Sequence, residues 1–83
     1  MRLNTPAQYS QAVADCTLTL FYQPSNIKAL YRRGTALAVL GRWKAAFADL
    51  KHLEKITPDD SPAREALRWA TERYAAVKAK ERS

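Results

Sequence analysis

Two basic residues one helical turn apart are the strongest candidates for chemistry in this sequence. Lys28 and Arg32 are four positions apart, and residues with that spacing on a helix point the same way. Carboxylates are their natural partners, because arginine binds a carboxylate through a bidentate fork and lysine acts as a compact point charge. Tyr31 and Thr35 flank the pair. These four residues form the candidate ligand-binding site.

The other reactive residue types do not assemble into a catalytic or metal site. Cys16 is the single cysteine, so the chain has no internal disulfide framework, and its sequence neighbours supply no activating base. His52 has no further ligand at metal-binding spacing, and Asp59 and Asp60 are better explained as helix-capping residues than as an acid–base pair. We therefore expect no enzymatic activity, no metal and no cofactor.

Composition indicates that helices must position the candidate site. The chain has 83 residues, enough for one small domain, and contains only 2 glycines and 4 prolines. Alanine and leucine are abundant and β-branched residues are few, which favours helix over strand. We expect an all-α fold with no sheet.

The charge of the chain narrows the class of partner. Fourteen Lys and Arg residues against 8 Asp and Glu give a formal net charge of +6, which attracts acidic peptides, nucleic acids or anionic membranes. The basic residues are scattered over several predicted helices, so we expect no nucleic-acid partner. No run of about 18 to 20 apolar residues is present and the N-terminus lacks an apolar signal core, so we expect no membrane partner.

A repeat with an offset of 34 residues organises the sequence. The aligned pairs are Tyr9 and Trp43, Ala12 and Ala46, Ala14 and Ala48, Asp15 and Asp49, Pro24 and Pro58, and Asn26 and Asp60. In each copy an aromatic residue opens a helix, an alanine follows three residues later for close helix contact, and a proline ends the segment. A period near 34 residues is typical of a helix-turn-helix solenoid.

Turn residues predict where the helices begin and end. We expect helices from Pro6 or Ala7 to Tyr22, from Ile27 to Leu40, from Trp43 to Ile56, and from about residue 61. Ser25 or Asn26 should cap the second helix, and Gly41 should end it in a left-handed conformation. The buried positions predicted in that helix are Ala29, Leu30, Gly34, Leu37 and either Val39 or Leu40.

Residues 9 to 58 resemble tetratricopeptide repeats. The motif residues are Asp15-Cys16, Pro24, Asn26, Lys28-Ala29-Leu30-Tyr31-Arg32-Arg33-Gly34 and Leu40-Gly41. They look like the last repeat of chaperone-binding co-chaperones such as the large immunophilins and the Hsp-organising scaffold. The resemblance implies a single domain over residues 1–83, an antiparallel α-solenoid fragment of about four helices. In it, residues 7–22 are the second helix of a truncated repeat, residues 27–57 one full repeat and residues 61–81 a terminal capping helix.

The resemblance also implies a function. In this family a two-carboxylate clamp grips the acidic C-terminal peptide of heat-shock chaperones of the seventy- or ninety-kilodalton class, and Lys28 and Arg32 occupy two of its positions. A further lysine and two asparagines of the clamp would lie upstream, and the stretch from Met1 to Pro6 does not supply them. We expect a cytoplasmic protein-interaction adaptor with a partial clamp, in which Tyr31 and Thr35 border the bound peptide.

An alternative reading is a structural element that self-associates or pairs with another repeat protein. About three stacked repeats are normally needed to bury a continuous core, so a shorter array leaves an apolar face open. The residues expected on that face are Leu18, Phe21, Ala36, Leu37 or Leu40. In either reading we expect Arg33 to pack its stem or to pair with an acid on a neighbouring helix, and Trp69 to be partly exposed.

Overall fold

The computed structural model describes residues 6–82, which form four helices. These are α1 (Pro6–Tyr22), α2 (Ile27–Val39), α3 (Trp43–Ile56) and α4 (Ser61–Arg82). No strand occurs between residues 6 and 82, and the predicted all-α class is confirmed. The expectation that the stretch from Met1 to Pro6 supplies no clamp residues falls mostly on residues 1–5, which lie outside the described residues.

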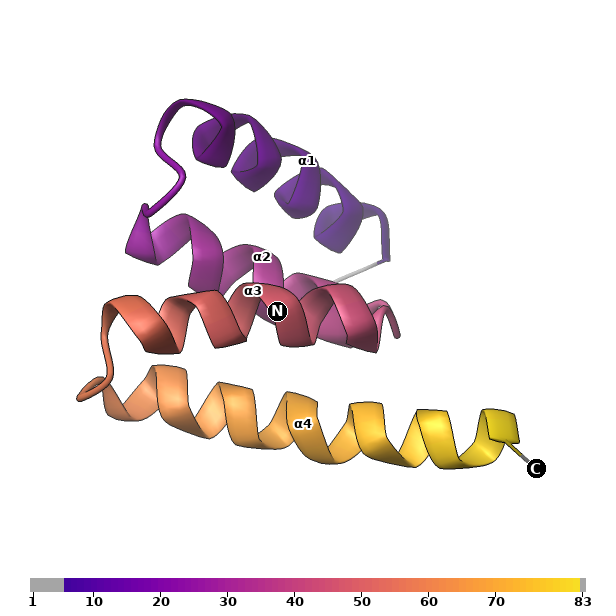
Figure 1. The fold of residues 1–83 in the computed structure, drawn as a ribbon. Helices are drawn as coiled ribbons and strands as arrows, with labels where there is room; N and C mark the ends of the chain where they lie inside the picture. The colour runs from indigo at the N-terminus through magenta and orange to yellow at the C-terminus, as the bar shows by residue number, and fades with distance from the viewer. Residues whose placement is uncertain (1–5, 83) are drawn as a thin grey trace, which may run out of the picture.

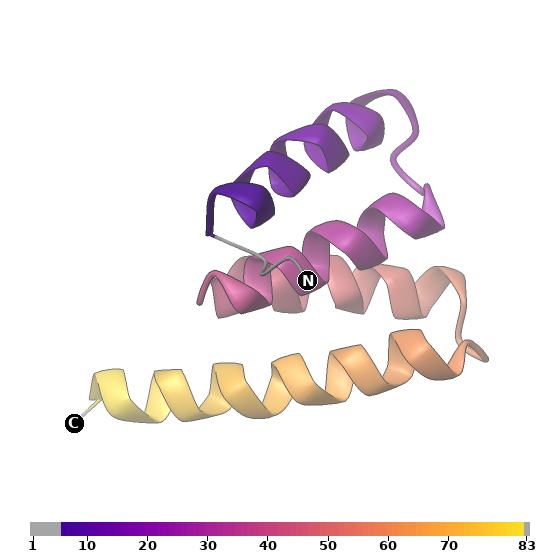
Figure 2. The same ribbon diagram turned by 180° about the vertical axis from the view of Figure 1, so that it is seen from behind.

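The helices pack in chain order. Each helix lies against the next one, and α4 also contacts α2. Figures 1 and 2 show α1 crossing over α2, with α3 and α4 running side by side and α4 continuing past the end of its neighbour. This arrangement leaves both flanks of α2 available to line surface hollows.

Local signals fix both ends of α2. Asn26 is the cap, and its side-chain oxygen accepts a hydrogen bond from the Ala29 amide at 2.9 Å. At the other end Gly41 has φ +83°, a left-handed conformation that glycine adopts without steric cost. The cap therefore falls on Asn26 rather than Ser25, and the predicted stop at Gly41 is confirmed.

Small residues allow α2 and α3 to approach closely. Gly34 faces Leu50, and a Cβ atom at Gly34 would lie 2.7 Å from both Cγ and Cδ2 of that leucine. Leu50 is fully buried, as are Leu30 and Leu53. The close contact between these two helices thus depends on the absence of a side chain at position 34.

The buried positions of α2 largely follow the predicted pattern. Ala29, Leu30, Gly34 and Leu37 are buried, whereas Val39 is 52% exposed and Leu40 is half-buried. Ala36 and Leu37 were expected on the open face, and that expectation is wrong because both are buried. Leu37 packs with Ala38 and Ala46, against Val13 of α1 and Trp43 of α3, so neighbouring helices already cover this side.

The open apolar face lies instead on α1. Leu18, Phe21 and Tyr22 are 62%, 76% and 74% exposed. The rings of Phe21 and Tyr22 contact each other edge to face at 5.1 Å. These three residues in the C-terminal half of α1 are thus the most exposed large apolar side chains of the described chain.

Candidate functional site

The basic pair on α2 is exposed and unpaired. Lys28 and Arg32 are both exposed, and neither forms an ion pair with any acid among the side chains described, those of residues 6–80. Asn26 caps α2 and so fixes where the helix that carries both residues begins. Both charges are therefore available to a ligand.

A neighbouring arginine shows the opposite arrangement. The Arg33 guanidinium donates two hydrogen bonds to the Asp49 carboxylate on α3, at 2.6 and 2.8 Å, and a third to the Thr17 hydroxyl of α1 at 3.2 Å. The bond to Asp49 raises the pKa of Arg33. This network joins three helices and fixes the rotation of α2. Of the two roles expected for Arg33, packing of its stem or pairing with an acid on a neighbouring helix, the pairing is present.

Two hollows flank α2, and three of the four candidate residues line one or both of them. The hollow between α2 and α4 has a volume of about 450 Å³, and its lining includes Tyr31, Thr35, Glu65 and Trp69. The hollow between α1 and α2 has a volume of about 320 Å³, and its lining includes Arg32 and Thr35. Thr35 lines both hollows, and Lys28 lines neither.

Thr35 is held in place by its own helix. Its hydroxyl donates toward the backbone carbonyls of Tyr31 and Arg32, at 2.9 and 3.1 Å. The side chain is therefore oriented before any ligand arrives. Tyr31, by contrast, is 39% exposed and offers part of its ring to the hollow between α2 and α4.

Two further residues shape the hollow between α2 and α4. Trp69 is 38% exposed, as expected, and its ring stands edge to face against Trp43 at 5.3 Å. Glu65 places a carboxylate in the same hollow. A bound acidic peptide would meet repulsion on that side, which favours placing its carboxylates near the basic pair instead.

Cys16 is part of the core. It is 4% exposed, and burial raises the pKa of its thiol. A buried, protonated thiol is a poor nucleophile and a poor metal ligand. Cys16 therefore contributes packing between α1 and its neighbours.

The described residues contain no metal-binding cluster and no membrane-spanning helix. Within residues 6–82, no group of three or more His, Cys, Asp or Glu side chains is arranged to hold a metal ion. No helix in the same range has the length and apolar character needed to cross a bilayer.

A third hollow was missed by sequence reasoning. It lies between the start of α3 and the C-terminal half of α4, and Trp43, Lys44, Tyr74 and Lys78 contribute to its lining. The Lys78 ammonium lies 5.5 Å from the centre of the Tyr74 ring. The spacing of Tyr74 and Lys78 on one helix was visible in the sequence, but their proximity to Lys44 requires the packing of two helices.

Comparison with known proteins gave several relatives, although no family model matches the chain. FKBP42 of Arabidopsis thaliana, a peptidyl-prolyl cis-trans isomerase, is 36% identical over 75 residues, which are 90% of this chain and 20% of that protein. Outer envelope protein 61 of the same plant is 35% identical over 68 residues, 82% of this chain and 12% of that protein. The human FK506-binding protein-like is 45% identical over 56 residues, 68% of this chain and 16% of that protein.

These relatives confirm the resemblance to tetratricopeptide-repeat proteins of the immunophilin and co-chaperone type. The chain spans only 12 to 20% of the length of the three relatives. The similarity supports a role in protein interaction.

Proposed function

We propose that this relative of immunophilin-type repeat proteins binds the acidic C-terminal peptide of a heat-shock chaperone of the seventy- or ninety-kilodalton class. Lys28 and Arg32 hold carboxylates of the peptide as a partial clamp, and Tyr31 and Thr35 border it. The observation that carries the proposal is the exposed basic pair on α2, which no acid of the described chain neutralises. The fixed Arg33 beside it keeps the helix from rotating this pair away.

The repeat architecture belongs to the same proposal. Residues 27–57 form one full repeat, residues 7–22 the second helix of a truncated repeat, and residues 61–81 the capping helix. The contact of α2 with both α3 and α4 supports this division. In it, α2 and α4 border the groove, and the hollow that contains Tyr31 and Trp69 forms part of its floor.

A cytoplasmic location is also part of the proposal. The single cysteine, Cys16, is a free thiol enclosed in the core, as suits a reducing compartment. The role is binding rather than catalysis, since the matched segments of the relatives are of the interaction type.

The terminal carboxylate of the peptide provides a direct test. A peptide ending in aspartate with a free C-terminus should bind at least about tenfold more tightly than its amidated twin, because amidation removes one charge-assisted hydrogen bond worth roughly 1.5 kcal/mol or more. Isothermal titration calorimetry at constant salt measures both affinities. Equal affinities, or no binding of either peptide, would contradict the proposal.

A second candidate function is self-association through α1, or pairing of α1 with another repeat protein. The observation that favours it is the exposed cluster of Leu18, Phe21 and Tyr22. Large apolar side chains that lie together on a surface mark an interaction site more often than isolated ones do. In this reading the basic pair is incidental.

Charge substitutions on α1 separate the two functions. In the self-association reading, the wild-type chain scatters light as a dimer at high concentration, and Leu18→Glu with Phe21→Glu makes it monomeric, because burying two carboxylates at the contact is unfavourable. Ala75→Glu with Ala76→Glu, at exposed positions of α4 away from the α1 cluster, adds the same charge as a control and should leave the mass unchanged. A wild-type chain that stays monomeric would remove this candidate.

A further inference from the structure

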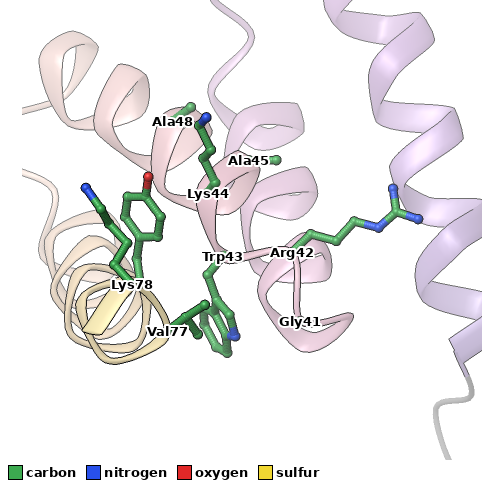
Figure 3. A pocket seen from close by; sticks show the side chains of 9 residues that line it. Gly41, Arg42, Trp43, Lys44, Ala45, Ala48, Val77 and Lys78 are labelled. Carbon is green, nitrogen blue, oxygen red and sulfur yellow. The ribbon is translucent and has the colours of Figure 1, made fainter. Parts of the chain in front are cut away.

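A further hollow of the described chain lies away from the basic pair on α2. It has a volume of about 840 Å³ and lies between the start of α3 and the C-terminal half of α4 (Figure 3). The nine residues that line it are Gly41, Arg42, Trp43, Lys44, Ala45, Ala48, Tyr74, Val77 and Lys78. Alanines on the α3 side leave room for a ligand beside the larger side chains.

Fixed aromatic rings form the apolar part of this hollow. Trp43 is half-buried and is held edge to face by Trp69, with the ring centres 5.3 Å apart. Tyr74 is also half-buried and lies 5.5 Å from Phe47. Val77 lines the same hollow (Figure 3). Because the rings are already held by core contacts, these protein side chains would lose little freedom when an apolar ligand group binds here.

The charged residues that line the hollow are all basic. Arg42, Lys44 and Lys78 belong to the lining, and none of the nine lining residues is acidic. Figure 3 shows Lys44 and Lys78 on two sides of the hollow, whereas the Arg42 side chain points away from it. Both lysines are exposed, and neither has a carboxylate partner among the side chains of residues 6–80. The two lysines are therefore the charges that a ligand would meet.

The start of α3 adds to this positive potential. Arg42 is its cap residue and makes no side-chain capping bond, and the first turn contains no acidic residue. The backbone hydrogen bonds begin with the Ala46 amide, which donates to the Arg42 carbonyl at 3.0 Å. The amides of the preceding turn thus still need acceptors, and helix N-termini favour negative groups. By contrast, α2 supplies its own acceptor through Asn26.

We propose that this hollow binds an acidic peptide segment that carries an aromatic or large aliphatic residue. The apolar side chain packs against Trp43 and Val77, and flanking carboxylates lie near Lys44 and Lys78. Charge complementarity selects this occupant over a second copy of the chain, which would bring a net charge of +6 to an already basic surface. The site lies on α3 and α4 and is therefore separate from the partial clamp on α2. Its ligand needs no free C-terminus.

A labelled peptide tests the proposal in the full chain. The probe is a fluorescein-labelled, C-terminally amidated Glu-Asp-Phe-Asp-Glu peptide, and binding is measured by fluorescence anisotropy at low salt. Lys44→Gln with Lys78→Gln should weaken binding by roughly fivefold or more, the range expected for two partly exposed ion pairs. Lys51→Gln with Lys55→Gln removes the same charge from exposed positions of α3 outside the hollow and should change affinity less than about twofold.

Two further measurements separate the parts of the proposal. Replacing the phenylalanine of the probe with serine should weaken binding by roughly tenfold, because the apolar contact with Trp43 and Val77 is lost. Circular dichroism should show unchanged helicity in both double variants, since all four positions are exposed. These results together would support a site with both an apolar and a basic part.

Several outcomes would overturn it. No binding of the probe by the wild-type chain would exclude the site. An equal loss of affinity in the Lys44/Lys78 and Lys51/Lys55 double variants would mean that the probe is attracted by overall positive charge and not by this hollow. Loss of binding only in Lys28→Gln with Arg32→Gln would place the probe on α2. Tighter binding of a single-stranded oligothymidine with the same dependence on Lys44 and Lys78 would assign the surface to nucleic acid instead.

Discussion

Replacing Lys28 and Arg32 together with alanine is expected to weaken binding of the acidic C-terminal peptide by about 100-fold or more. Each residue supplies a charge-assisted hydrogen bond of roughly 1.5 kcal/mol or more, and a combined loss of about 3 kcal/mol exceeds a factor of 100 in affinity. Calorimetry with the free-carboxylate peptide measures the loss. The thermal unfolding midpoint should stay within a few degrees, because both side chains are exposed.

The matched control for this variant lies on α3. Lys51 and Lys55 are also exposed and four residues apart, so replacing both with alanine removes the same net charge from a different surface. Peptide affinity should then fall less than about threefold, through long-range attraction alone. A similar loss in both variants would mean that the basic pair on α2 has no specific role.

The second large effect concerns stability. Leu50→Ala is expected to lower the free energy of unfolding by roughly 2 to 5 kcal/mol, because Leu50 is fully buried in the core. For a domain of this size each kcal/mol corresponds to a shift of about 4 to 8 °C in the unfolding midpoint, which differential scanning calorimetry resolves. Leu18→Ala, at a position that is 62% exposed, should cost less than about 0.5 kcal/mol.

A double-mutant cycle tests the proposed reason for the stability loss. Gly34→Ala in the wild-type chain forces a Cβ atom to within 2.7 Å of Leu50, so it should destabilise the protein by about 1 to 3 kcal/mol despite the better helix propensity of alanine. In the Leu50→Ala background the same change fills vacated space and should become neutral or stabilising. Strict additivity of the two changes would show that positions 34 and 50 do not restrict each other.

The sequence was most informative about the helices. Pro24, Asn26, Gly41 and Pro58 are local signals, each acting on the backbone within a few residues, and the observed helix ends lie close to the predicted ones. The choice between Ser25 and Asn26 as the cap was left open because both residue types can accept the same amide bond. Only the geometry assigned the bond to Asn26.

Properties that depend on helix crossing were less predictable. The charge and spacing of Lys28 and Arg32 follow from their positions on one helix, but which hollow each residue lines depends on how α1 and α4 cross α2. Ala36 and Leu37 were placed on the open face because the sequence did not reveal that α1 and α3 cover them. Whether the four candidate residues bind a peptide stays a prediction.

Long-range partners were predictable in kind but not in identity. The sequence left Arg33 either to pack its stem or to meet an acid on a neighbouring helix, and the structure identifies Asp49, sixteen positions later, as its partner. The hollow formed by α3 and α4 was missed altogether, because Lys44 and Lys78 lie on different helices. Its recognition needed the contact between those helices rather than any single motif.

The two glycines of the chain are constrained in different ways, and this affects how the sequence can diverge. Position 34 is limited by the volume of a neighbour, since a Cβ atom there would meet Leu50, so it is free to covary with residue 50. Position 41 is limited by its own left-handed backbone, with nothing within 4 Å of a Cβ atom, so no compensating change elsewhere relieves the strain. Among natural variants, substitutions at position 34 should be accompanied by smaller residues at position 50, whereas glycine at position 41 should persist whatever its neighbours become.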